Sequence, residues 1–285
     1  MSKQPLVSLI IPTYNRSHTI GAAIDSVLAQ TAQDFELIVV DDGSTDDTSD
    51  RVKGYSDPRI KYYKKPNGGP SAARNFGVLM ATAPWVMYLD SDDVLLPACI
   101  ETMLSSLSRH PEAVFAFPRA DRKLELYEDG VLVKSVDDSG DTPAAFTIHD
   151  IFMRNAGFSC NAFTHLRSLA GEGLLWDEQL SSMEDWELMM TIGEKYPRGF
   201  LYVPVVLYQY RQRFGSDNIV SHGQYKTWAD AFEYIYQKHQ NDKLLTGQTW
   251  YPSRVEKWTK FQREFEAGKR PAFKYHYFQD TSPDR

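Results

Sequence analysis

Four residues, Asp90–Asp93, bring three carboxylates together directly after the apolar segment 85–89. Alternate residues of an extended chain point to the same side, so Asp90 and Asp92 can face one cleft. Crowded carboxylates repel each other. A divalent cation such as Mg²⁺, which prefers carboxylate, phosphate and water oxygens, removes that penalty. The pattern indicates a metal site, but a solvated acidic turn before the helix that follows Pro97 would have the same sequence.

A second acidic turn, Asp41–Asp46, follows the apolar segment 35–40. A carboxylate there could accept hydrogen bonds from a nucleobase or a ribose. The turn could also be purely local, with an Asx turn and a helix N-cap at Ser44 or Thr45. The sequence of the turn leaves both interpretations open.

A glycine-rich turn, 66–70, precedes a predicted helix over about 71–81. Gly68 and Gly69 allow the backbone to approach a ligand closely, and Arg74 falls in the first turns of the helix. A helix N-terminus with a guanidinium nearby suits a phosphate or the polar edge of a base. The sequence lacks the usual motifs of dinucleotide-binding proteins (GxGxxG), P-loop proteins (GxxxxGK[ST]), metalloproteases (HExxH) and α/β-hydrolases (GxSxG), which disfavours these functions.

The segments around these turns predict an α/β fold with a mainly parallel sheet flanked by helices. Strands are expected over 6–11, 35–40, 59–63 and 85–89, and helices over 17–30, with Ser17 as N-cap, 46–54 and 71–81. This alternation is typical of βαβ units. Ligands bind outside the carboxyl ends of such strands, so the polar turns 12–16, 41–46 and 90–93 should gather at one edge.

The remaining chain has a less regular pattern. We expect a strand over 114–117, a hairpin over 127–133 around Asp129 and Gly130, a helix over 184–196, a strand over 201–210, and helices rich in aromatic residues from about 224 onward. The strand over 201–210 is expected at an edge of the sheet, because Pro204 cannot donate a hydrogen bond to a neighbour.

Composition limits the class of protein. The 285 residues are 42% hydrophobic and 24% charged, as in soluble globular proteins, and the net charge of −7 gives no sign of nucleic-acid binding. Cys99 and Cys160 form no CxxC pair, which predicts two packed thiols in a reducing compartment rather than a zinc or redox site. Because no run of 18 apolar residues occurs, we expect a cytoplasmic protein, at most peripheral at the inner face of the cell membrane.

Five segments carry a resemblance when they are taken in order. They are VSLIIPTYNR ending at Arg16, SVLAQT at 26–31, FELIVVDDGSTD at 35–46, NGGPSAARNFG at 67–77 and YLDSDD at 88–93. Together they closely resemble the family 2 glycosyltransferases, which are inverting enzymes of the GT-A fold. The resemblance is dense over 6–110, thins through 111–170 and resumes over 175–188.

The resemblance implies roles for single residues in binding a UDP-sugar. Pro12 and Tyr14 would hold the nucleotide base, Asp42 would read uracil, and Arg74 would be the partner of Asp42. Asp90 and Asp92 match the D-x-D element, in which Asp92 would be the direct ligand of Mg²⁺ or Mn²⁺.

By the same resemblance Asp185 is the catalytic base. This role makes chemical sense, because inversion needs one carboxylate to take the acceptor proton while the nucleoside diphosphate leaves from the opposite face. Glu184 is the alternative base, unless its charge only stabilises a helix N-terminus. Arg211 could approach the diphosphate, and we expect His165 and His222 to be structural.

The tail over 251–276 mixes basic and aromatic residues. It could lie at a membrane interface, but we favour packing of its apolar side chains against the catalytic domain. The expected domains are a GT-A domain over 1–220, with a nucleotide-sugar half (6–110) and an acceptor half (111–220), and a helical extension over 221–285.

The predicted function is transfer of a sugar from a UDP-sugar to a hydroxyl of a carbohydrate or lipid-linked carbohydrate, in the synthesis of a cell-surface polysaccharide. One alternative is a nucleotidyltransferase that makes nucleotide-sugars, which would need a basic glycine-rich loop after the first strand. The other is a non-catalytic nucleotide-sugar binder.

Overall fold

The computed structural model describes residues 4–128, 131–137, 164–214 and 225–239, together with residues 256, 259, 260, 263 and 267. The chain forms two compact units. The first consists of residues 1–121 and 141–210, and the second of residues 122–140 and 211–285. The packing thus groups the segment 122–140 with the C-terminal part, whereas the expected domain boundary near 220, with its two halves and its extension, remains a prediction.

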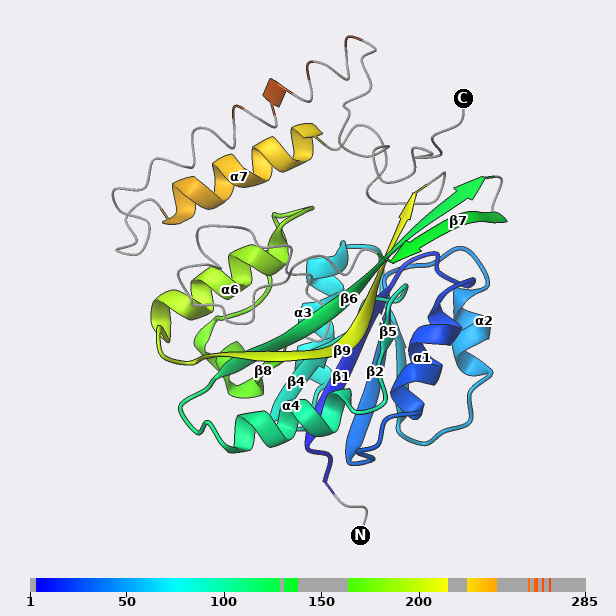
Figure 1. Cartoon of the computed structure of the whole chain (residues 1–285), viewed down its shortest axis with the longest axis vertical. Coiled ribbons are helices and arrows are strands. Elements are labelled where there is room, and N and C mark those ends of the chain that lie inside the picture. The colour runs from blue at the N-terminus through cyan, green and yellow to red at the C-terminus, as the bar shows by residue number, and fades with distance from the viewer. Residues whose placement is uncertain are drawn as a thin grey trace, which may run out of the picture. The chain divides into compact units, whose positions relative to one another are not determined.

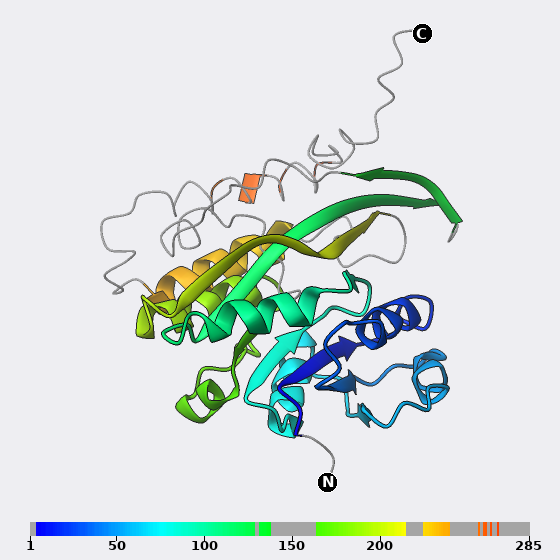
Figure 2. The same cartoon turned by 60° about the horizontal axis from the view of Figure 1, so that its bottom comes forward.

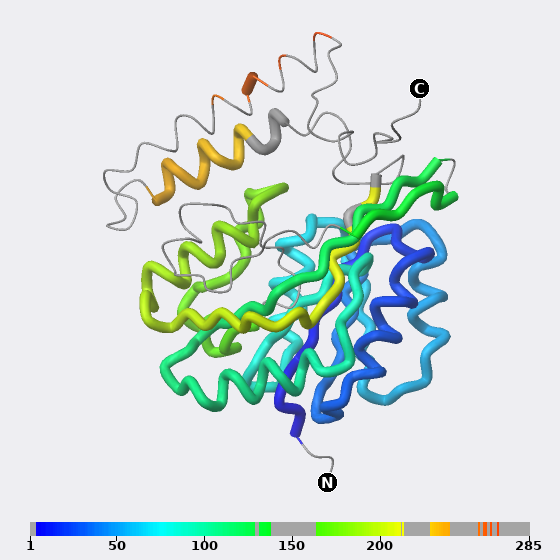
Figure 3. Tube along the Cα trace, viewed as in Figure 1, coloured from blue at the N-terminus to red at the C-terminus, as the bar shows by residue number. Residues whose placement is uncertain are grey.

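The first unit is built on four parallel strands. They are β1 (Val7–Thr13), β2 (Phe35–Asp41), β3 (Ile60–Lys64) and β4 (Trp85–Tyr88), in the order β3-β2-β1-β4. The helices α1 (Ile20–Leu28), α2 (Thr48–Lys53) and α3 (Pro70–Met80) connect them. Figure 3 shows β1 in the interior of this sheet. The expected parallel βαβ arrangement is confirmed, although α1 begins only at Ile20, after Thr19 rather than Ser17.

Further strands, with antiparallel pairs among them, extend the sheet beyond β4. The strands described are β8 (Thr164–Leu166), β6 (Phe115–Glu128), β9 (Phe200–Phe214) and β5 (Val94–Leu95), in the order β4-β8-β6-β9-β5. The helices here are α4 (Cys99–Ser108), α6 (Glu184–Lys195) and the short 3₁₀ helix η1 (Arg167–Glu172) (Figure 1). Both β6 and β9 run on into the second unit.

The expected edge position of the strand that contains Pro204 is wrong, because β9 lies between β6 and β5. The missing N–H of Pro204 is nevertheless accommodated. The two-residue strand β5 pairs only with Tyr208 and Gln209 of β9, and Leu96 donates to the carbonyl of Leu207. Pro204 therefore lies past the end of β5, where β9 has no β5 hydrogen bond to lose.

Alternate residues of the parallel strands face two layers of helices, as the period of a strand requires. Leu9, Ile11 and Leu37 share one apolar cluster with α1 and α4, all fully buried. Ile10 faces the opposite layer, where α3 packs so closely that a Cβ on Gly77 would lie 2.5 Å from Ile10 Cγ2. The helices α1 and α2 lie side by side (Figures 1 and 2). The two layers hold the carboxyl ends of the strands in fixed positions.

The second unit contains the distal part of β6, which pairs with β7 (Val131–Asp137) as the expected hairpin, and the helix α7 (Tyr225–His239). The turn residues 129 and 130 lie outside the described residues. The buried Glu125 accepts hydrogen bonds from Arg211 and Arg213. α7 confirms that the chain becomes helical after 224. In the part of the chain that the structure describes, no helix is both long and apolar enough to cross a membrane.

Candidate nucleotide-sugar site

The turns that follow β1 and β2 are joined at the carboxyl edge of the sheet, as expected. Asn15, with a φ of 52°, accepts a hydrogen bond at Oδ1 from the backbone N–H of Thr45 (2.8 Å), and its own N–H donates to Ser44 Oγ. Pro12 is buried near the end of β1, and Tyr14, the residue directly after this strand, is 45% exposed. An exposed ring at a sheet edge is available for stacking on a base.

Asp41 and Asp42 have different roles, although both are buried. Asp41 makes the local turn, because its carboxylate accepts hydrogen bonds from the Ser44 N–H and the Tyr62 hydroxyl. Neither Ser44 nor Thr45 is a helix N-cap, since α2 starts at Thr48. The local turn is therefore present at Asp41, the expected N-cap at Ser44 or Thr45 is wrong, and recognition of a base or ribose by Asp42 stays a prediction.

Asp42 holds the glycine turn that opens α3. Its carboxylate accepts hydrogen bonds from the backbone N–H groups of Gly68 (3.0 Å) and Gly69 (2.7 Å), and from Lys65 Nζ (2.5 Å). Gly69 has a φ of +88°, which suits glycine. Lys65 is not among the site residues predicted from the sequence. Its place directly before the glycine-rich turn 66–70 is the feature that could have indicated it.

Arg74 forms hydrogen bonds with two carboxylates other than Asp42, and its expected partnership with Asp42 in binding the nucleotide stays a prediction. The buried guanidinium donates to Asp90 Oδ1 and to Glu184 Oε1, both at 2.9 Å. Its carbon Cζ lies 4.4 Å from the centre of the Trp176 ring. Arg74 therefore connects the acidic loop after β4 with the first residue of α6.

Asp185 follows Glu184 in the first turn of α6, and it is half-buried. One of its oxygens, Oδ1, accepts the Trp186 N–H at 2.8 Å. Burial and then the negative charge of Glu184 raise the pKa of Asp185 to about 7, although the Trp186 N–H and the charge of Arg74 act in the opposite direction. A carboxyl with a pKa near neutrality is suited to accept and release a proton.

The acidic loop offers oxygen ligands but no preformed metal cage. Asp92 exposes 27% of its side chain and lies 3.9 Å from Arg16 Nε. Among the described residues, no group of three or more acidic, histidine or cysteine side chains is placed to hold a metal. One or two carboxylates fit Mg²⁺ or Mn²⁺ when the substrate phosphates and water supply the other ligands. The residues present fit that kind of cation.

The other residues considered from the sequence have the following surroundings where they are described, and the approach of Arg211 to a diphosphate stays a prediction. His165 is buried at 2.7 Å from the Tyr88 hydroxyl, and burial lowers its pKa to about 4. Cys99 is a buried free thiol, as expected. Arg211 pairs with Glu125 in the second unit. Cys160 and His222 lie outside the described residues.

Residues 8–166, more than half of the chain, match the model of Glycosyl transferase family 2. The chain belongs to this family. A UDP-Glc:alpha-D-GlcNAc-diphosphoundecaprenol beta-1,3-glucosyltransferase of Escherichia coli is 41% identical over 106 residues, or 37% of this chain and 42% of that protein. A hyaluronan synthase of Pasteurella multocida is 42% identical over 106 residues, or 36% of this chain and 11% of that protein. The matches span less than half the length of the curated relatives.

The fold resembles that of Staphylococcus aureus TarS 1-349, whose crystal structure was solved in complex with UDP-GlcNAc. The TM-score is 0.63 at 20% sequence identity, and the match covers 91% of this chain and 72% of that chain. At this identity the likeness shows the fold. The expected GT-A type of α/β fold is therefore confirmed for this member of the family.

Proposed function

We propose that this glycosyl transferase family 2 member is an inverting glycosyltransferase that moves a sugar from a UDP-sugar to a hydroxyl of a carbohydrate or lipid-linked carbohydrate. The observation that carries the proposal is the ion pair between Arg74 and Glu184 beside Asp185. It occupies Glu184 and leaves Asp185, with its raised pKa, as the carboxylate that can take a proton. Asp185 is therefore our candidate for the general base.

The donor would bind along the carboxyl edge of β1, β2 and β4. We propose that Pro12 and Tyr14 contact the base and that Asp42, fixed by Lys65 and two backbone N–H groups, accepts from the uracil N3–H. Because Asp42 and its partners are already in place, binding the base costs little further ordering.

The leaving diphosphate would lie at the loop after β4. We propose that Asp92, with Asp90 beside it, holds Mg²⁺ or Mn²⁺, which supplies Lewis-acid stabilisation of the diphosphate charge when it is bound. Arg74 keeps Asp90 in place through the hydrogen bond to its Oδ1. Asp185 would then remove the proton from the acceptor hydroxyl as the hydroxyl oxygen attacks the anomeric carbon.

The class of acceptor is suggested by the E. coli and P. multocida relatives, whose names describe a diphosphoundecaprenol-linked substrate and a hyaluronan synthase. We propose an acceptor of this kind and a part in the synthesis of a cell-surface polysaccharide. A lipid-linked acceptor would place the reaction at a membrane surface.

A two-stage experiment tests the proposed function. First, the melting temperature is measured with UDP-glucose, UDP-GlcNAc, UDP-glucuronic acid, GDP-mannose and CMP-sialic acid, with and without Mn²⁺, since selective binding stabilises a fold by mass action. Second, UDP release and transfer of labelled sugar are measured with each stabilising donor. Stabilisation by UDP-sugars together with transfer supports the proposal. Release of pyrophosphate from UTP and a sugar phosphate would instead indicate a nucleotidyltransferase, and binding without turnover would indicate a non-catalytic binder.

A further inference from the structure

Arg74 is held from behind by an aromatic ring from a distant part of the chain. Its Cζ lies 4.4 Å from the ring centre of Trp176, which is 2% exposed. The ring of Tyr88, the last residue of β4, meets Trp176 edge-on at 4.9 Å between centroids. The indole thus fills the space behind the guanidinium, whose two terminal nitrogens point to Asp90 and Glu184.

Asn75 fixes the position of Trp176. The Asn75 side chain accepts from the Trp176 N–H and donates to the Trp176 carbonyl, both at 2.9 Å. Its amide also donates to Glu178 Oε1. These two hydrogen bonds join residues 101 positions apart in the sequence, and they fix the backbone of Trp176 relative to α3. Since Asn75 directly follows Arg74, α3 carries both the guanidinium and the clamp that places its aromatic support.

The support of Arg74 by Trp176 affects two carboxylates of the proposed reaction centre. Arg74 is the positive group between Asp90, on the loop proposed to hold the metal, and Glu184, next to the proposed base. A guanidinium against an aromatic face is restricted to the plane of that face. Tilting it by loss of the ring would weaken the hydrogen bonds to both carboxylates at once.

We infer that Trp176 and Asn75 are positioning residues for sugar transfer, acting through Arg74 on the acidic loop after β4 and on the start of α6. They do not touch the substrate themselves. The inference rests on the proposed function for its kinetic consequence, and on the geometry around Arg74 alone for its structural consequence.

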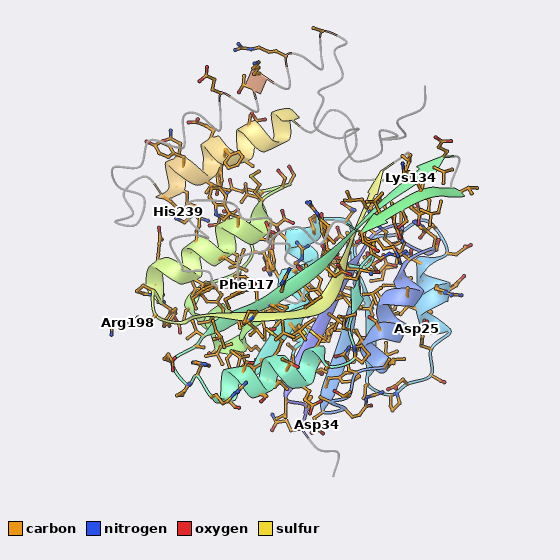
Figure 4. All side chains as sticks on the ribbon, in the orientation of Figure 1. Asp25, Asp34, Phe117, Lys134, Arg198 and His239 are labelled. Atoms are coloured by element: carbon orange, nitrogen blue, oxygen red, sulfur yellow. The ribbon has the colours of Figure 1, made fainter. Side chains whose placement is uncertain are left out.

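The chain contains a matched control. Arg59 lies over the ring of Phe35 at 4.3 Å, the same kind of contact as Arg74 over Trp176, and Phe35 is also buried. Phe35 opens β2, at the end opposite to the proposed site, next to Asp34, which is labelled in Figure 4. The variant Phe35→Leu therefore loses a buried ring and an arginine contact without affecting Arg74.

The kinetic test compares Trp176→Leu, Trp176→Phe and Phe35→Leu in the full chain. We expect Trp176→Leu to lower kcat about tenfold with a change of less than about threefold in the KM of the UDP-sugar, as the loss of a desolvated cation–π contact would predict. Trp176→Phe keeps an aromatic face and should recover most of that loss. Phe35→Leu should keep the parental kcat. Equal losses in Trp176→Leu and Phe35→Leu would reduce the role of Trp176 to stability and overturn the inference.

A double-mutant cycle tests whether the effect passes through Arg74. In an Arg74→Lys background, where the planar fork is already lost, Trp176→Leu should lower kcat less than about twofold further. Full additivity of the two losses would overturn the inference. If Trp176→Leu does not fold, Asn75→Asp takes its place, since a carboxylate cannot donate to the Trp176 carbonyl.

A measurement without turnover separates the inference from the proposed function. In a ¹⁵N NMR spectrum of the arginine side chains, the Arg74 signal should be shifted by the Trp176 ring. It should move toward its random-coil position in Trp176→Leu and in Asn75→Asp, and stay shifted in Phe35→Leu. If no donor is turned over but the signal moves in this way, the proposed function fails and the positioning of Arg74 stands. An unmoved Arg74 signal would overturn the positioning even in an active enzyme.

Discussion

Arg74 and Glu184 are separated by 110 positions of sequence, and their side chains meet at 2.9 Å between Nη1 and Oε1. The same guanidinium reaches Asp90 through Nη2. This pair joins the helix α3 to the helix α6, and it gives the two neighbouring carboxylates of α6 different surroundings. Glu184 is hydrogen-bonded to a cation, whereas the positive charge of Arg74 acts on Asp185 by electrostatic attraction and opposes the rise of its pKa. The difference leads to the first prediction.

Asp185→Asn should bind UDP-sugar and metal nearly as the parent does, while transfer falls about 10²–10⁴-fold, the usual contribution of a general base. The amide keeps the size of the carboxylate and its acceptor for the Trp186 N–H, but it cannot take a proton. Transfer of labelled sugar to the acceptor is the quantity to measure, because hydrolysis of the donor by water can persist without the base.

Glu184→Gln is the matched control for Asp185→Asn. The glutamine oxygen can still accept from Arg74, so we expect a loss of less than about tenfold in transfer. An inactive Glu184→Gln beside a nearly parental Asp185→Asn would move the base to Glu184. Activity in both variants would place the base outside α6.

The pH dependence of kcat/KM should follow the proton of Asp185. Burial first, and then the charge of Glu184, raise its pKa to about 7. The protonated form cannot act as a base, so kcat/KM should rise as the pH increases through about 7 and then level off. In Asp185→Asn this rise should disappear. A parental profile that is flat from pH 5 to pH 8 would contradict the assignment.

Asp92→Ala should weaken the metal-dependent part of UDP binding while the fold stays intact, because the side chain is partly exposed on a loop. Titration calorimetry with UDP, with and without Mn²⁺, measures this directly, and we expect the enhancement by Mn²⁺ to fall at least about tenfold. Asp34→Ala, at the opposite end of the sheet (Figure 4), should keep the full enhancement. Unchanged metal dependence in Asp92→Ala would remove this residue from the site.

Asp42→Ala should weaken binding of UDP more than binding of Mn²⁺, and it should also lower the free energy of unfolding by about 1–3 kcal/mol. The stability cost arises because the Gly68 and Gly69 N–H groups lose their acceptor. Lys65→Met removes the ion pair with Asp42 and the hydrogen bond to the Pro66 carbonyl, but it keeps the Asp42 carboxylate as acceptor for the Gly68 and Gly69 N–H groups. It therefore separates the effect of the lysine charge from that of the carboxylate. Equal affinity for UDP in Asp42→Ala and the parent would exclude Asp42 from base recognition.

Glu36 should make the protein sensitive to acid. Burial alone would raise its pKa, but hydrogen bonds from Lys61, Ser8 and Thr82 outweigh burial and lower the pKa from 4.5 to about 2. A carboxyl with a lowered pKa stabilises the fold above its unfolded-state pKa and loses that effect as the pH falls. The free energy of unfolding should therefore drop by about 2 kcal/mol between pH 4.5 and pH 2 from this group. In Glu36→Gln, urea unfolding should show a smaller drop over the same range.

The amino-acid sequence by itself determined the parallel sheet and the edge at which its polar turns meet. The evidence for both is local. Buried strands are short apolar runs, helices repeat every three to four residues, and a turn such as Asp41–Asp46 ends a strand wherever it occurs. Because the strands are parallel, their carboxyl ends lie at one edge of the sheet, and this can be predicted without knowing any side-chain contact.

Only the tertiary structure decided which side chains meet at that edge. Nothing in the sequence indicated that Lys65 and the glycine turn hold Asp42, or that Arg74 reaches Glu184. The interior position of β9 could not be predicted from the sequence either. Pro204 shows that one backbone hydrogen bond is missing, but it does not show which strands lie on either side. Contacts between residues about a hundred positions apart depend on how helices and sheet pack. Periodicity within one segment contains no information about that packing.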